Sequence, residues 1–126
     1  MLVRISLMVL RLCVLLAVIL GILFWLNVLT PAGTILEVHQ TLGILVVLTL
    51  WIIGVMTLLR GHLVWGIVAL VWGALVLYVG TQQETLLPGS SHWVIEVVHL
   101  LLGLGAAGVG ESCARRFKRS LKAAKA

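Results

Sequence analysis

Long apolar runs separated by short polar segments make up most of this chain. The runs cover about residues 12–29, 35–59, 63–80 and 93–110. A helix that crosses a bilayer needs about 20 mostly apolar residues, and these runs approach or exceed that length. An isolated sheet would leave backbone groups unpaired in lipid, so helices are expected. The pattern predicts an all-α membrane protein in which four transmembrane helices form a single domain.

Short polar segments containing Pro or Gly end the apolar runs. Such short connections make consecutive helices antiparallel, which predicts an up-down-up-down four-helix transmembrane bundle. Composition agrees, because 62% of the 126 residues are hydrophobic and only 10% are charged, whereas soluble domains carry about 25% charged residues. The first run follows Arg4 and Arg11, as a secretory signal would, but it is longer than the roughly 7–15 apolar residues of such a signal. We therefore interpret it as a span.

The basic residues are distributed very unevenly along the chain. Six of the nine lie in a terminal tail at about 113–126, and the others are Arg4, Arg11 and Arg60. The segments at 30–34 and 81–92 contain none. Cytoplasmic loops carry the excess of Lys and Arg. Both termini are therefore expected on the cytoplasmic side of the membrane, which is a bacterial inner membrane or a plasma membrane. The tail predicts contact with the lipid bilayer and not with nucleic acid.

The side-chain inventory excludes several kinds of site. The two cysteines, Cys13 and Cys113, are far apart and form no Cys-x-x-Cys pair. A zinc knuckle, a thioredoxin-like motif and a covalently attached c-type haem are therefore excluded. The chain has four Glu and no Asp, from which no hydrolytic site can be assembled.

The two halves of the chain resemble each other. Each half has an apolar run, a Pro-containing turn, and then a second run with His-x-x-x-Gly near its start, at His39 to Gly43 and at His99 to Gly103. A tandem repeat of two helical hairpins would relate the halves by an axis along the membrane normal. The spacing from turn to histidine differs by three residues, so a duplication is one interpretation of the pattern.

Position separates the four histidines. His62 and His92 flank apolar runs and are expected at the membrane interfaces. His39 and His99 lie inside the second and fourth spans, each about 10 Å below the outer interface at 1.5 Å per residue. In an up-down bundle these two spans are diagonal across the core, so the two imidazoles are expected at one depth and facing each other.

Two imidazoles in this arrangement can bind one haem iron from both faces. Gly43 and Gly103 lie one helical turn below the histidines on the same faces, and their lack of side chains makes room for a flat macrocycle. The third run has Gly66, Gly73 and Gly80 at seven-residue intervals, which gives one smooth face. Two alternatives remain open: histidines that hydrogen-bond a neighbouring helix, and a site for a quinone or another metal.

The two spans with His-x-x-x-Gly resemble those of the four-helix membrane cytochromes b. The resemblance implies one non-covalent haem b with His39 and His99 as axial ligands, and Gly43 and Gly103 beside the haem. It implies an electron carrier rather than an enzyme that transforms a substrate, with a quinol or an extracytoplasmic redox protein as partner. His62 has no matching histidine, so one haem is expected. The alternative function is a structural or accessory membrane subunit without haem.

Overall fold

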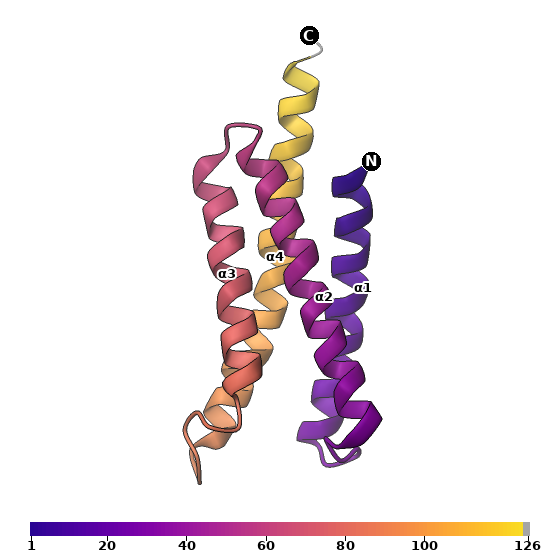
Figure 1. Cartoon of the computed structure of the whole chain (residues 1–126), viewed down its shortest axis with the longest axis vertical. Helices are drawn as coiled ribbons and strands as arrows, with labels where there is room; N and C mark the ends of the chain where they lie inside the picture. Colours follow the sequence, from indigo (N-terminus) through magenta and orange to yellow (C-terminus); the bar gives the residue numbers. More distant parts are fainter. Residues whose placement is uncertain (125–126) are drawn as a thin grey trace.

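Four long helices make up almost the whole chain in a computed structural model, which describes residues 1–124 (Figure 1). They are α1 (Leu2–Trp25), α2 (Gly33–Leu58), α3 (Leu63–Gln82) and α4 (His92–Ala123). Each contains a window apolar enough to cross a membrane, and each is at least 20 residues long. The predicted all-α bundle of four apolar helices is confirmed.

The chain direction alternates from one helix to the next, so that both termini lie at the same end of the bundle (Figure 1). Each helix contacts its neighbours in the chain, and α1 also contacts α4. Of the two diagonals, α2 and α4 touch, whereas α1 and α3 do not within the described residues. Helices α2 and α4 therefore form the short diagonal of the bundle.

We call the end with both termini and the α2–α3 turn the terminal end, and the end with the loops 26–32 and 83–91 the distal end. Among the described residues, the distal end carries Glu37, Glu84 and Glu96 and no Lys or Arg. The basic residues lie in the other half of the bundle, where Arg11 of α1 forms an ion pair with Glu111 of α4. The charge asymmetry of the sequence is thus an asymmetry between the two ends of the bundle.

Helix α1 begins and ends earlier than the apolar run at 12–29. It begins at Leu2 and ends at Trp25, because Asn27 adopts a left-handed conformation with φ of 55°. The amide of Val28 then donates to the carbonyl of Leu23, and that of Asn27 to the carbonyl of Phe24. This pair of bonds closes a helix C-terminus, and asparagine is one of the few residues that tolerates the required conformation. Hydropathy alone does not show this stop.

The α2–α3 turn uses the same closure with a glycine. Gly61 has φ of 81°, its amide donates to the carbonyl of Leu58, and the amide of His62 donates to the carbonyl of Thr57. A glycine adopts this conformation without steric cost. The turn therefore brings α2 and α3 together over only four residues, 59–62.

Helix α4 continues well beyond the predicted span at 93–110. It remains helical through the basic tail to Ala123 and extends past the other helices at the terminal end (Figure 1). At 1.5 Å per residue its 32 residues span about 48 Å, more than the roughly 30 Å of a hydrocarbon core. The last two residues of the predicted tail, 125–126, lie outside the described residues.

The closely packed core is confined mainly to the half of the bundle nearer the terminal end. The buried residues of α1 lie between Val3 and Val14, and those of α2 between Val46 and Thr57. In α4 no residue between Ile95 and Ala106 is fully buried. The distal segments of these three helices, which include both histidines of interest, are therefore less tightly packed than the rest.

Candidate functional site

The structure brings the two intramembrane histidines together. His39 is the seventh residue of α2 and His99 the eighth of α4. These helices run in the same direction from the distal end, so both rings lie about 10 Å from the helix starts at 1.5 Å per residue. The ring centroids are 6.2 Å apart and the ring planes are inclined by 59°. The expected meeting of two imidazoles at one depth is present.

Neither ring is satisfied by the protein. The Nδ1 atoms of His39 and His99 are both buried and have no hydrogen-bond partner among the described residues. The backbone carbonyl of Ala17 on α1 lies close to the His39 ring, although no hydrogen bond to Nδ1 forms. Buried polar atoms are nearly always paired, and leaving one unpaired costs about 1–3 kcal/mol. Both unpaired atoms belong to the two rings whose centroids are 6.2 Å apart.

Two glycines allow the rings to approach the neighbouring helices. A Cβ at Gly80 of α3 would come within 3.0 Å of Cε1 of His99, and one at Gly21 of α1 within 3.6 Å of Cε1 of His39. Each histidine therefore lies against a glycine on the preceding helix of its own hairpin. Gly80 belongs to the predicted glycine series on the third helix, whereas Gly21 was not predicted. The sequence holds a sign of this role, because Gly21 precedes His39 by 18 residues and Gly80 precedes His99 by a similar 19 residues.

Phe24 of α1 also contacts the histidine pair, which the sequence pattern does not predict. Its ring centroid lies 5.5 Å from that of His39, with the planes inclined by 66° in an edge-to-face contact. Aromatic pairs favour this arrangement. Phe24 thus limits the movement of the His39 ring from the side of α1, and no sequence pattern distinguished it from a residue at the membrane interface.

Gly43 and Gly103 border open space. A Cβ built at either position would meet no atom within 4 Å beyond its own helix surroundings. They differ in this from Gly21 and Gly80, whose neighbours are the histidine rings themselves. No side chain of another helix therefore occupies the position of a Cβ at either glycine, one helical turn closer to the terminal end than the histidines.

The other two histidines lie apart from this pair. His62 precedes α3 at the terminal end, and His92 is the first residue of α4. Nδ1 of His92 is 3.4 Å from the carbonyl oxygen of Leu86 in the preceding loop. Both histidines are half-buried. Neither can add a third ligand to the pair inside the bundle.

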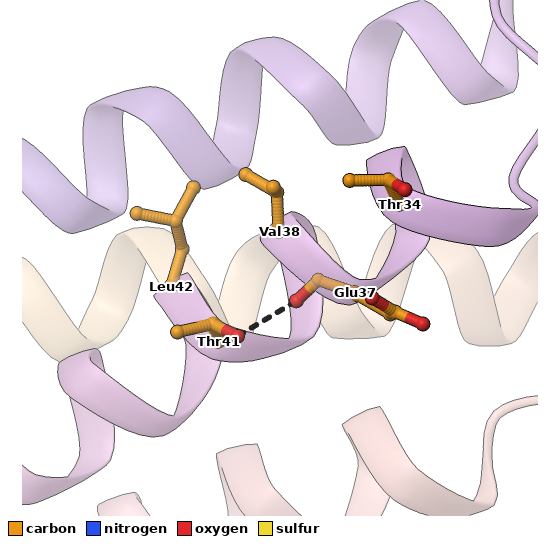
Figure 2. A pocket seen from close by; sticks show the side chains of 5 residues that line it. All are labelled: Thr34, Glu37, Val38, Thr41 and Leu42. Atoms are coloured by element: carbon orange, nitrogen blue, oxygen red, sulfur yellow. Dashed lines mark hydrogen bonds between the residues drawn. The ribbon is translucent and has the colours of Figure 1, made fainter.

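A hollow of about 270 Å³ lies along the distal part of α2. Five residues on one face of the helix line it: Thr34, Glu37, Val38, Thr41 and Leu42 (Figure 2). The hydroxyl of Thr41 donates to the backbone carbonyl of Glu37 at 2.8 Å, so it is already paired within the helix. Figure 2 shows Val38 and Leu42 pointing toward the adjacent helix. The hollow contains neither histidine and assembles no set of reactive groups.

The ligand set available at the histidine pair limits its chemistry. Within residues 1–124 no group of three or more His, Cys, Asp or Glu side chains is arranged to hold a metal ion. A structural or catalytic zinc site needs three or four protein ligands. Two imidazoles could hold a metal that arrives with its other ligands, as the iron of a haem does.

Comparison with known proteins gives no further guide to the site. The chain matches no protein-family profile, no curated protein and no solved structure.

Proposed function

We propose that this chain is a four-span membrane cytochrome that holds one non-covalent haem b between His39 and His99 and carries electrons. The observation that supports it most directly is the separation of 6.2 Å between the two ring centroids. An imidazole nitrogen binds a metal at about 2 Å and lies about 1 Å from its own ring centre, so two rings on opposite sides of one metal have centroids about 6 Å apart.

The state of the two rings also fits axial ligation. Each has a buried Nδ1 without a partner, so neither needs to break a hydrogen bond on binding. A ligating histidine commonly donates its other ring N–H to a backbone carbonyl, which fixes the tautomer and the ring orientation. The carbonyl of Ala17 is in position to take this role for His39.

The space around the rings is consistent with a flat ligand. Gly43 and Gly103 border open volume, and the distal segments of α1, α2 and α4 have fewer buried side chains than the other half, with Ile95 as the one buried there among the described residues. A macrocycle in that volume would supply the missing apolar contacts. Its propionates would reach the distal surface, where the polar groups are hydroxyls and amides such as those of Thr34, Gln40, Ser90 and Ser91.

The residues of the site suit an electron carrier. A haem with two histidine ligands exchanges single electrons and leaves no open iron position for a substrate. The chain's own contribution is to hold both imidazoles, to exclude water with Phe24 and the surrounding apolar side chains, and to place the site about 10 Å from the distal end. A quinol in the bilayer or a redox protein outside the membrane is the expected partner.

The orientation in the membrane follows from the charge asymmetry. The terminal end, with its excess of Lys and Arg, is assigned to the cytoplasm, and the distal end to the outer surface of a bacterial inner or plasma membrane. The haem would then lie near the outer face. A second haem at the cytoplasmic end would need two histidines there. His62 is the only histidine at that turn among the described residues, so we propose one haem.

An internal repeat of two hairpins accompanies this proposal. Each hairpin supplies one histidine from its second helix, and the ring lies against a glycine of its first helix, Gly21 or Gly80. Two hairpins related by an axis along the bundle would place equivalent histidines face to face. A symmetric cofactor bound at that axis is the simplest ligand for such an arrangement.

The alternative of an accessory subunit without haem has less support. It requires the two histidines to stabilise the bundle by hydrogen bonds between helices. Neither Nδ1 atom makes such a bond with the described residues. As purely structural residues, the two histidines would each cost stability.

Absorption spectroscopy tests the proposal. The protein is purified in detergent from cells supplied with haem, and oxidised and dithionite-reduced spectra are compared. We expect sharp low-spin α and β bands on reduction and about one haem per chain. His39→Ala and His99→Ala are each expected to abolish these bands, because each removes one axial ligand.

The other two histidines provide the matched controls. His62→Ala and His92→Ala should retain the spectrum, since neither residue belongs to the pair inside the bundle. A folded wild-type protein that stays colourless after haem is supplied would refute the cytochrome proposal and favour the accessory subunit. Equal loss of haem in all four variants would also contradict the assignment of ligands.

A further inference from the structure

A second cluster of functional groups lies at the terminal end, where the α2–α3 turn meets α4. Arg60 of the turn has its guanidinium carbon 5.4 Å from the ring centre of Phe117 on α4. Arg116 of α4 has its guanidinium carbon 3.7 Å from the ring centre of Trp65 on α3. Each side of the contact thus contributes one arginine and one aromatic ring, and the two cation–π pairs hold both guanidinium groups in place.

Further contacts fix the geometry of this cluster. The Cys113 thiol lies 3.3 Å from the backbone carbonyl of Trp65 and donates to it, which joins α4 to α3. Nη1 of Arg116 donates to the carbonyl of Ser112 at 3.1 Å. Phe117 and Cys113 are buried. Because the arginines are already ordered, binding an anion would cost little side-chain entropy.

The positive charge of the cluster is not balanced by the protein. Glu111 is the only acidic residue in this half of the bundle among those described, and its carboxylate pairs with Arg11. No carboxylate pairs with Arg60 or Arg116 within the described chain. In the same turn, Nε2 of His62 is buried and also lacks a partner there. The cluster therefore has charge and hydrogen-bonding capacity for an anionic ligand.

We infer that Arg60 and Arg116 bind the phosphate of an anionic phospholipid. Guanidinium groups match phosphate oxygens in charge and geometry. The cluster lies where α2 ends and α3 begins. The termini of spanning helices are at the depth of the lipid headgroups. Basic pockets between transmembrane helices on one membrane side commonly hold such headgroups. This inference does not depend on the haem.

Lipid binding to the purified protein tests the inference. Phosphatidylglycerol is titrated into the protein in a neutral detergent, and bound lipids are counted by native mass spectrometry while the melting temperature is recorded. We expect one tightly retained phosphatidylglycerol and a raised melting temperature. The double variant R60Q/R116Q should bind it about 30-fold more weakly, because each arginine contributes about 1 kcal/mol, or about fivefold.

The matched control removes the same charge elsewhere on α4. Lys118 and Arg119 are exposed, and in K118Q/R119Q we expect less than about a threefold change, because the two aromatic rings of the cluster hold Arg60 and Arg116 and neither of these residues. Equal weakening in both double variants would show diffuse attraction instead of a site and would overturn the inference. If the double variant does not fold, R60Q alone is tested, because Arg60 is exposed. K118Q is then its control.

Two further ligands separate lipid from other sources of the same chemistry. Phosphatidylcholine, whose headgroup has no net charge, should not protect the protein. Inorganic phosphate at equal concentration should not protect it either, since it lacks acyl chains. If either protects as well as phosphatidylglycerol, the assignment to an anionic lipid is wrong.

Discussion

At the scale of single residues, two histidines and four glycines shape the contact between α2 and α4 and the helices beside it. His39 and His99 face each other with unpaired Nδ1 atoms, and four glycines surround them in two roles. Gly21 and Gly80 let the rings lie against neighbouring helices, whereas Gly43 and Gly103 border open space. The first pair positions the imidazoles, and the second leaves volume beside them.

Filling the open space tests its use without disturbing the imidazoles. Gly43→Leu and Gly103→Leu place a side chain where the folded protein has no atom within 4 Å of a Cβ. We expect both variants to fold with a near wild-type circular dichroism spectrum. Haem should bind at least about tenfold more weakly, a loss of about 1.4 kcal/mol or more, because the leucine occupies its volume.

Gly108→Leu is the control for these two variants. Gly108 also lies on α4 and also borders open space, but it is nine residues from His99, or about 13 Å along the helix. Its haem content, measured by absorbance per protein, should match the wild type. If Gly43→Leu and Gly103→Leu also keep full haem content, the ligand does not occupy the space beneath the histidines.

At the scale of helices, tryptophan and glycine join neighbouring elements by a repeated contact. Nε1 of Trp51 donates to the carbonyl of Leu70 at 3.0 Å, and the indole lies against Gly73. Nε1 of Trp72 donates to the carbonyl of Leu102 at 2.9 Å, and its indole lies against Gly105. In both, the acceptor carbonyl is three residues before the glycine, so the missing side chain admits the indole to the backbone.

Alanine substitutions on α4 test this contact. A Cβ at Gly105 would collide with the indole of Trp72, whereas one at Gly108 would meet nothing. We expect Gly105→Ala to destabilise the protein by about 1–3 kcal/mol through overpacking. Gly108→Ala should be neutral or stabilise by up to about 1 kcal/mol, because alanine is the better helix former.

The measurement is unfolding in detergent, followed by tryptophan fluorescence and by helical circular dichroism. Equal stability of the two alanine variants would show that the indole moves aside without cost. The α3–α4 contact would then not depend on the glycine.

At the scale of the whole molecule, the separation of charge between the two ends predicts the orientation in the membrane. The distal end has three Glu and no Lys or Arg among the described residues, and the terminal end has the basic extension of α4. Short loops with Lys and Arg stay on the cytoplasmic side. Both termini are therefore expected inside and the loops 26–32 and 83–91 outside.

Cysteine labelling of intact cells tests this orientation. Ser90 in the distal loop and Ala124 after α4 are both exposed, whereas the native Cys13 and Cys113 are buried and give little background. A membrane-impermeant maleimide should label Ser90→Cys in intact cells and Ala124→Cys only after permeabilisation. The opposite pattern would reverse the assigned sides and place the histidine pair near the cytoplasmic face.

Some of the structure was predictable because it depends on patterns local to the chain. Apolar runs of spanning length require helices in lipid, and turns of a few residues require antiparallel neighbours. The equal depth of His39 and His99 followed as well, since both are a similar number of residues from the start of parallel helices. The end of α1 was placed too late, because the helix stops at the conformation of Asn27 and not where hydropathy falls.

Other features were decided only when the helices packed. The sequence by itself determined four apolar helices, an excess of charge at one end and two histidines at one level. Tertiary structure decided that α2 and α4 form the short diagonal and that Phe24 and Gly21 lie against His39. It also placed Arg60 on the ring of Phe117 and Arg116 on the ring of Trp65. The physical reason is that hydropathy and spacing fix the height of a residue along a helix, while the rotation of each helix about its own axis depends on which side chains interlock with its neighbours.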